Sequence, residues 1–298
     1  MNTLLVRTLS AAVFALIVVT VLVWDPSYTF SAYTLCFRFS LFLPFSLLIA
    51  WGSLREYYRL SAESAGFADE PKVSQTGLFL GVFLVGVSYF FNQRFQLQDI
   101  VYVFPMLAML LFFFELKRNQ PRPFDNIGRH LTGWVWIVLP LMLATNLYFE
   151  KGGVFLFACL WLIWANDSGA YIIGSLLGRT PFLQRISPHK TWEGFFGGAM
   201  ATLGFAFCYP AIPQLGGNPV WYWVTVGVVV VIASTCGDFV ESLFKRSVGV
   251  KDSGTMMPGH GGFLDRFDSY LGMLPFLAFT LWLLYQVETL LLVIQYLG

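Results

Sequence analysis

Long apolar runs dominate this sequence of 298 residues. A helix that crosses a bilayer needs roughly 20 mostly apolar residues. Nine such runs occur, near residues 4–24, 31–51, 76–92, 99–115, 131–149, 153–177, 194–212, 220–244 and 267–294. Charged residues make up only 12% of the chain, against about 25% in soluble domains, so a soluble globule could not cover its surface. The sequence therefore predicts an all-α, polytopic integral membrane protein with about nine transmembrane helices.

The basic residues lie mostly on one side of the predicted membrane. Of the 18 Lys and Arg residues, 15 fall near the N-terminus or in the breaks after the second, fourth, sixth and eighth runs. Because basic residues favour the cytoplasmic side, we expect the N-terminus and these breaks in the cytoplasm and the C-terminus outside. The first run has no small-residue cleavage site before Trp24, which favours a first span over a removed signal peptide.

Polar residues gather in the second half of the chain. Seven of the 17 acidic residues lie between residues 167 and 268. Acids in or beside apolar helices are costly and are by default functional hypotheses. We therefore expect residues 1–150 to form anchor and scaffold helices and residues 151–298 to form a catalytic membrane domain. In the first half, the segment 53–60 (SLREYYRL) is either a short interfacial helix or a charged extension of the second run.

One face of the eighth run carries a polar stripe. Residues at i, i+3, i+4 and i+7 share a helical face, and here they are Asp238, Glu241, Ser242 and Lys245. Such a stripe must face protein or water, either as part of a site or as a self-paired packing element. The pair Asn166-Asp167 in the sixth run has two similar interpretations, a polar site or a hydrogen bond between helices.

The break after the eighth run combines the features of a cation and phosphate site. Its five glycines allow positive φ and a close approach to a ligand. Its four basic residues are Lys245, Arg246, Lys251 and Arg266. Asp265 and Asp268 stand three residues apart at the start of the ninth run, and that spacing lets both reach one point. Hard oxygen ligands beside basic residues and glycines indicate a site for phosphates and a divalent cation, with Mg²⁺ expected.

The break after the sixth run offers a second set of polar groups. Ser187, Lys190 and Thr191 precede a glycine-rich helix start at Gly194. Thr191 either caps that helix or contacts a substrate. The helix N-terminus would also suit an anion.

Several of these segments resemble the motifs of one enzyme family. They are Asn166-Asp167, the run 187–194 (SPHKTWEG), Gly237-Asp238-x-x-Glu241-Ser242, Ser242-x-Phe244-Lys245-Arg246, Lys251-Asp252 and the run 258–268 (PGHGGFLDRFD). The chain resembles the phosphatidate cytidylyltransferases (CDP-diacylglycerol synthases), closely over residues 160–275 and only in hydropathy over the first half. Ser168, His189 and Met257 depart from the usual family residues, which leaves fine substrate preference open but not the reaction.

The resemblance implies synthesis of CDP-diacylglycerol and pyrophosphate from CTP and phosphatidic acid with Mg²⁺. It implies one or two divalent cations on Asp238, Asp265 and Asp268, with a monovalent cation as a further option. The expected catalytic residues are Asp238, Lys245, Arg246, Lys251, Asp265 and Asp268. The expected substrate-binding residues are Asn166, Asp167, Ser187, Lys190, Thr191, Ser242, Gly259, His260, Gly261, Gly262 and Arg266.

The same resemblance bears on partners and location. We expect CTP, phosphatidic acid and membrane lipid as partners, no nucleic acid, and a homodimer. With the charge asymmetry, it places the protein in a bacterial inner (cytoplasmic) membrane with the active site on the cytoplasmic side. His260 either contacts a phosphate or closes the loop by a hydrogen bond, and Asp252 could serve only as an exposed ion pair with a neighbouring basic residue.

Other functions fit these residues less well. An ion-coupled transporter also has intramembrane acids and glycine-broken helices, but it predicts polar residues near the bilayer midplane and an inverted repeat. Here the polar residues cluster towards one face and no repeat is found. Closer alternatives are CTP transfer to a different lipid phosphate and a CTP-dependent lipid kinase, and the motifs disfavour the kinase. A purely structural membrane protein would not need the clustered acids and bases.

Overall fold

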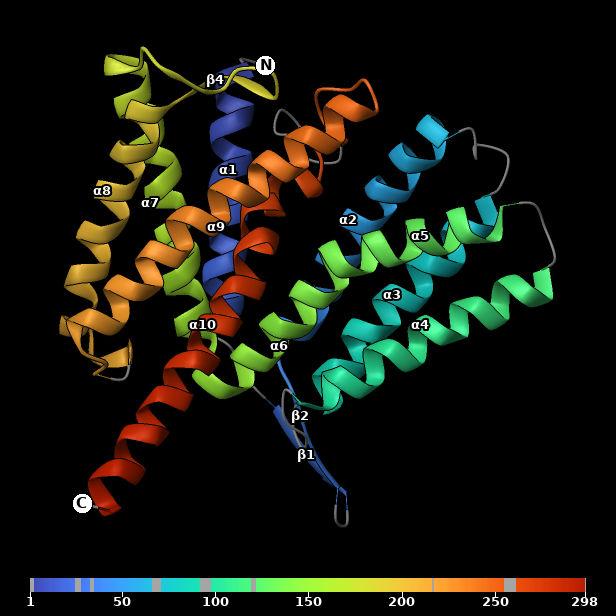
Figure 1. Cartoon of the computed structure of the whole chain (residues 1–298), viewed down its shortest axis with the longest axis horizontal. Coiled ribbons are helices and arrows are strands. Elements are labelled where there is room, and N and C mark those ends of the chain that lie inside the picture. Colours follow the sequence, from blue (N-terminus) through green and yellow to red (C-terminus); the bar gives the residue numbers. More distant parts are fainter. Residues whose placement is uncertain are drawn as a thin grey trace. The chain divides into compact units, whose positions relative to one another are not determined.

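The protein is helical along nearly its whole length (Figure 1). The structure is a computed structural model and describes residues 3–24, 28–32, 35–65, 71–91, 98–118, 122–215, 217–254 and 261–297. The long helices are α1 Thr3–Leu22, α2 Phe42–Ala65, α3 Pro71–Phe91, α4 Gln98–Arg118, α5 Pro123–Gly133, α6 Leu139–Lys151, α7 Gly153–Leu177, α8 Trp192–Cys208, α9 Val220–Ser247 and α10 Leu264–Leu297. Short helical turns are η1 Trp134–Val138, η2 Tyr209–Ala211 and η3 Pro213–Leu215. The predicted all-α class is confirmed.

Two small antiparallel hairpins were not predicted. One pairs β1 Tyr28–Ala32 with β2 Leu35–Phe39, and the other pairs β3 Pro181–Leu183 with β4 Ser187–Thr191. The predicted helical run 31–51 is wrong at its start, because α2 begins only at Phe42. The reason is Pro44, which would break a helix interior but is tolerated in the first turn. The residues before α2 are rich in Tyr, Thr and Phe, which favour strands.

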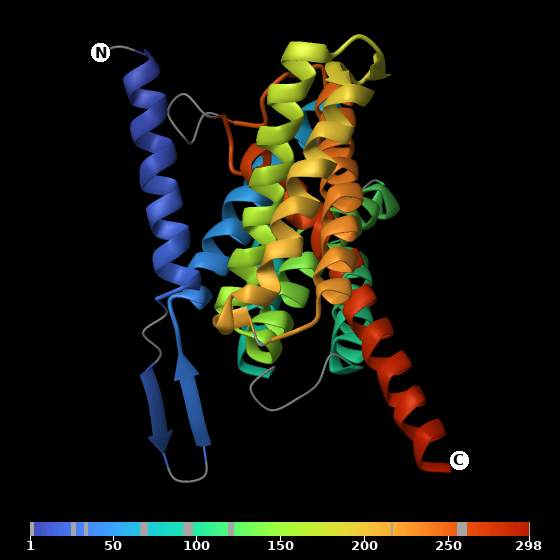
Figure 2. The same cartoon turned by 90° about the vertical axis from the view of Figure 1, so that its left-hand side faces the viewer.

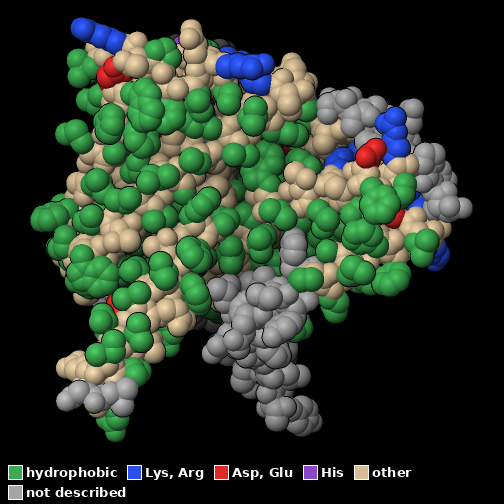
Figure 3. Space-filling model, viewed as in Figure 1, with side chains coloured by type: hydrophobic (Ala, Val, Ile, Leu, Met, Phe, Trp, Pro, Cys, Tyr) green, Lys and Arg blue, Asp and Glu red, His purple; other side chains and the backbone are tan. Residues whose placement is uncertain are grey.

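Four helices are long and apolar enough to cross a membrane among the described residues. They are Pro123–Lys151, Gly153–Leu177, Val220–Ser247 and Leu264–Tyr296, and they match the fifth, sixth, eighth and ninth predicted runs. Shorter apolar helices cover Ser10–Leu22 and Gln75–Phe91. Hydrophobic side chains are spread over the described part of the face shown in Figure 3, and Phe279, Trp282 and Leu290 of α10 are exposed. Apolar surface on this scale fits contact with lipid.

The chain packs as two units that share its last two helices. Unit 1 comprises residues 1–157 and 241–268, and unit 2 comprises residues 158–240 and 269–298. The end of α9 and the start of α10 therefore belong to unit 1, and the remainder of both helices belongs to unit 2.

Unit 1 is built around the contact of α2 with α3, η1 and α6. Trp134 is fully buried and donates its indole N–H to the carbonyl of Gly77 (3.1 Å). A side chain at Gly77 would overlap Tyr58, so the glycine lets α3 lie close to α2. The segment 53–60 is a continuous part of α2 rather than a separate interfacial helix, and Tyr57 and Tyr58 are buried in it.

Unit 2 depends on small residues between its helices. Figures 1 and 2 show α7 and α8 side by side, joined at one end by the β3–β4 hairpin. A Cβ atom on Gly169 would overlap Ala201 and the backbone of Gly197. Likewise, a Cβ on Gly272 of α10 would overlap the backbone of Gly237 on α9. Small residues allow such close backbone approach, which is how helices associate in membranes.

Candidate functional site

The predicted polar stripe on α9 lies partly inside unit 1. Glu241 is fully buried, and the Lys245 ammonium pairs with it one turn further along the helix. Lys245 also lies 2.7 Å from Oδ1 of Asp265, at the start of α10. The stripe is therefore not simply self-paired along one helix, because Lys245 ties α9 to the first turn of α10.

Asp265 organises the start of α10. Its Oδ2 accepts hydrogen bonds from the N–H of Gly262 (2.8 Å), the N–H of Ser253 (2.9 Å) and the hydroxyl of Ser253 (3.0 Å). Gly261 has φ +83°, and a side chain there would overlap Oδ2 of Asp265. The glycines at 261 and 262 thus let the backbone close around this carboxylate. Gly259 and His260, predicted beside them, lie outside the described residues.

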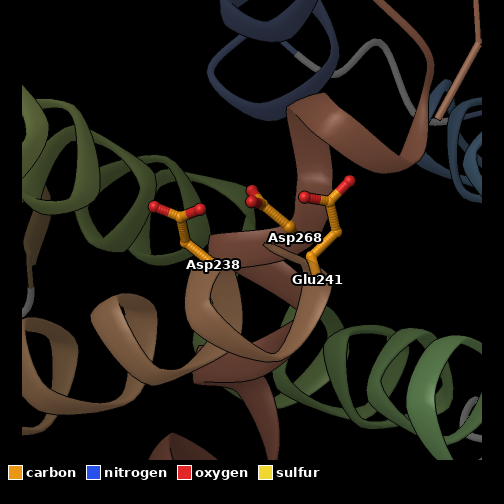
Figure 4. A group of neighbouring side chains, drawn as sticks. All are labelled: Asp238, Glu241 and Asp268. Atoms are coloured by element: carbon orange, nitrogen blue, oxygen red, sulfur yellow. The ribbon is translucent and has the colours of Figure 1, made fainter. Parts of the chain in front are cut away.

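Figure 4 shows the acidic side chains of Asp238 and Glu241 on α9 and of Asp268 on α10. Within unit 1, a carboxylate oxygen of Glu241 lies within 4.8 Å of one of Asp268, and both residues are buried. Asp238 precedes Glu241 by one turn on the same helix. Close carboxylate oxygens are the ligands that hard divalent cations take in proteins. Glu241 was recognised in the sequence stripe but was not predicted as a metal ligand.

Asp238 has a basic partner within unit 2. The ammonium of Lys190, at the end of the β3–β4 hairpin, forms an ion pair with Asp238 and lies 4.8 Å from the ring centroid of Phe239. Phe182 of the hairpin stacks on Phe239 with ring centroids 5.1 Å apart. The hairpin therefore brings Lys190 of β4, a predicted site residue, next to Asp238 of α9. Ser187 lies in the same hairpin, opposite Leu183.

The start of α8 is capped by its own residues. Oγ1 of Thr191 accepts a hydrogen bond from the N–H of Gly194 (3.2 Å), so the capping interpretation of Thr191 is confirmed. Glu193 accepts hydrogen bonds from the N–H groups of Arg179 and Thr180 and from the Thr180 hydroxyl. Its own backbone N–H and these donors lower the pKa of Glu193 to about 2. An ionised Glu193 therefore holds the entry to the hairpin.

The other predicted residues are placed less centrally. Nδ2 of Asn166 is 3.5 Å from the hydroxyl of Thr235, and Asn166 is buried, as expected of a hydrogen bond between helices. The guanidinium of Arg246 donates to the carbonyl of Val250 (3.2 Å). Ser242 is half-buried on α9, and the side chains that are exposed are Asp167, Arg246, Lys251 and Arg266.

A residue of the N-terminal half was missed by the sequence reasoning. The carboxylate of Glu56, on α2, accepts hydrogen bonds from the hydroxyl of Ser253 (2.7 Å) and from the N–H groups of Phe263 and Leu264 (both 2.9 Å). Within the segment 53–60, only the presence of an acid beside an apolar run hinted at this role. Nothing in the local pattern indicated its partners, which lie about two hundred residues further along the chain.

Comparison with known proteins gives a consistent result. The model of the family described as "Cytidylyltransferase family" matches residues 5–284. A phosphatidate cytidylyltransferase of Bacillus subtilis is 34% identical over 242 residues, which cover 80% of this chain and 89% of that protein. The one from Staphylococcus saprophyticus is 32% identical over 237 residues, covering 78% and 86%. The one from Staphylococcus epidermidis is 47% identical over 122 residues, covering 41% and 46%.

Proposed function

Because the chain belongs to the cytidylyltransferase family, we propose that it transfers the cytidylyl group of CTP to phosphatidic acid, forming CDP-diacylglycerol and releasing pyrophosphate. The observation that carries this proposal is the buried acidic group of Glu241 and Asp268, next to the Lys245 ammonium and the glycine-containing start of α10. The named relatives, all phosphatidate cytidylyltransferases, support phosphatidic acid as the lipid substrate.

The reaction brings two anions together. An oxygen of the lipid phosphate attacks the α-phosphorus of CTP, and the bond from that phosphorus to the oxygen bridging the β-phosphate breaks, so that its electron pair leaves with pyrophosphate. A phosphate monoester is already ionised near neutral pH, so no general base is required. Catalysis of such transfers consists mainly of positioning and charge stabilisation. We assign the positive charge to Lys190, Lys245, Arg246, Lys251 and Arg266.

The acidic residues fit a divalent cation. Oε1 of Glu241 is buried and has no hydrogen-bond partner among the described residues. We propose that Glu241 and Asp268, with Asp238 one turn before Glu241, hold Mg²⁺. When bound, such a cation neutralises phosphate charge and polarises the phosphoryl group. Asp265, predicted as a ligand, is assigned instead to positioning Lys245 and the start of α10, because both of its oxygens accept hydrogen bonds from protein groups.

The location follows from the charge pattern. The described helices α1, α2, α3, α4, α5–α6, α7, α8, α9 and α10 follow the order of the nine predicted runs, which supports nine spans. We propose that the N-terminus and the active site face the cytoplasm of a bacterial cell and that residues 1–150 anchor the catalytic residues 151–298. Phosphatidic acid then presents its headgroup where cytosolic CTP arrives.

The expected homodimer is tested by the sedimentation of detergent-purified protein.

One assay tests the reaction and the metal assignment together. Detergent-purified protein is incubated with labelled CTP, phosphatidic acid and Mg²⁺, and we expect labelled lipid and pyrophosphate in equal amounts. Glu241→Gln and Asp268→Asn should each lose about 100-fold or more of the rate. Glu288→Gln, an exposed acid on α10, is the matched control and should keep it. Near-normal rates in both site variants would refute the metal assignment. Solute flux into proteoliposomes without labelled lipid would favour the transporter.

A further inference from the structure

The carboxylate of Glu56 occupies the N-terminal end of α10. Glu56 is 5% exposed. Its Oε1 accepts from the N–H of Phe263, and its Oε2 accepts from the N–H of Leu264. Because α10 begins at Leu264, these are donors that the helix itself leaves unpaired. A carboxylate there is also favoured by the helix dipole. Glu56 therefore caps a helix that lies about two hundred residues further along the sequence.

The described residues of the loop between α9 and α10 (248–254 and 261–263), here called the signature loop, leave room for this side chain. A Cβ atom on Gly254 or on Gly262 would overlap the Glu56 carboxylate. One turn along α2, Nη2 of Arg59 donates to the carbonyl of Ser253 at 2.5 Å. Gly52, one turn before Glu56, leaves room for the ring of Phe263. Three successive turns of α2 thus contact the loop that precedes α10.

The contacts continue from Glu56 into the acidic group. The hydroxyl of Ser253 lies 2.7 Å from Oε2 of Glu56 and 3.0 Å from Oδ2 of Asp265. The N–H of Ser253 also donates to Asp265, and Asp265 in turn binds the Lys245 ammonium. Lys245 completes the series by pairing with Glu241. A change at Glu56 would therefore reach Glu241 through groups in direct contact.

We propose that Glu56 is a positioning residue for the cytidylyl transfer, an inference that rests on the proposed function. Glu56 holds Ser253 and the start of α10 in place, and through them it fixes Asp265 and Lys245 relative to Glu241. Residues that orient a metal or phosphate site through a first layer of groups change activity or metal affinity by about 10- to 100-fold when they are replaced. The N-terminal half thereby contributes directly to the geometry of the site as well as to membrane anchoring.

Glu56→Gln is the sharpest test. The amide keeps the size of the side chain but replaces one acceptor oxygen by an NH₂ group that faces an N–H donor. We expect kcat to fall about 10- to 100-fold and the half-saturating Mg²⁺ concentration to rise, in protein that elutes and melts as the wild type does. Glu56→Asp, which keeps the charge, should restore part of kcat. Glu115→Gln replaces another buried glutamate of unit 1, paired with Arg118, and is the matched control with unchanged kinetics.

Ser253→Ala is a second variant that does not disturb the helix cap. It removes the hydroxyl between Glu56 and Asp265 but keeps the backbone donor, so we expect a smaller loss of kcat in the same direction. Wild-type kcat and Mg²⁺ dependence in either Glu56→Gln or Ser253→Ala would overturn the inference while the proposed function stood. If wild-type protein made no CDP-lipid, the proposed function would fail instead. Hydrogen exchange over residues 261–268 then decides: faster exchange in Glu56→Gln supports the positioning role, and unchanged exchange rejects it.

Discussion

Replacement of Lys245 by Met tests the structural role of this residue together with its proposed catalytic role. Its ammonium lies 2.7 Å from Asp265 and also pairs with Glu241, and the side chains of Lys245 and Glu241 are 12% and 0% exposed. Met keeps the apolar stem but removes the charge. Because buried carboxylates then lose their cation, we expect the free energy of unfolding to fall by about 3–5 kcal/mol. Cytidylyl transfer should be lost as well.

The double variant Lys245→Met/Glu241→Gln provides the internal comparison. It removes one negative charge together with the positive one. Asp265 still accepts hydrogen bonds from Gly262 and from both donors of Ser253. We therefore expect the free energy of unfolding to return to within about 1 kcal/mol of the wild type. Activity should stay absent, because both replaced residues belong to the proposed site.

Unfolding is followed by circular dichroism as sodium dodecyl sulfate is added to mixed micelles, and cytidylyl transfer is measured on the same preparations. Lys151→Met is the matched control, since Lys151 pairs with Glu150 at 3.3 Å where both side chains are exposed. Exposed pairs contribute about 1 kcal/mol or less. If Lys245→Met proved as stable as Lys151→Met, the argument that Lys245 neutralises buried acids would be refuted.

Three further predictions follow from the packing, the hairpin and the charge pattern. Gly272→Val should lower the melting temperature and the yield of folded protein, because its Cβ would overlap the backbone of Gly237; Gly204→Ala, which meets open space, should not. The stabilising effect of ionised Glu193 should be complete above its ordinary pKa of 4.5 and lost as the pH falls towards 2. Hydrogen exchange of the Thr180 N–H should therefore be slower in the wild type than in Glu193→Gln at pH 4.5 and above, with the difference vanishing near pH 2. An epitope tag at the C-terminus should react with antibody from outside intact spheroplasts, whereas reaction only after lysis would reverse the proposed orientation.

Hydropathy predicted the bounds of the helices most closely where no other sequence signal competes with apolar length. The run 153–177 coincides with α7, and the run beginning at 220 coincides with the start of α9. The prediction failed at 31–41, where Pro44 and strand-forming residues compete with apolar length. It also left open the segment 53–60, because a polar turn on an apolar helix suits either the headgroup region or a buried partner. The structure gives the segment a buried partner in the signature loop.

The candidate site was predictable in composition but not in its contacts. Clustering of acids between residues 167 and 268 singled out Asp238, Asp265 and Asp268 as candidates, since costly acids that gather along an apolar sequence indicate a function. Glu56 escapes such a criterion because a single supporting residue forms no cluster. Its role depends on tertiary packing of α2 against a distant loop, and no local period or spacing carries that information.

The hydrogen bonds of the acidic side chains distinguish roles that the sequence alone did not. Glu56 accepts three hydrogen bonds from the chain, and Asp265 accepts four. Carboxylates saturated in this way are suited to holding backbone in place. Glu241 is as deeply buried, yet one of its oxygens has no hydrogen-bond partner among the described residues, and a carboxylate of Asp268 lies nearby. Since burying an acceptor without a partner is costly, that oxygen is the one best explained by a bound cation. We therefore propose that positioning and ligation fall to different carboxylates of the same cluster.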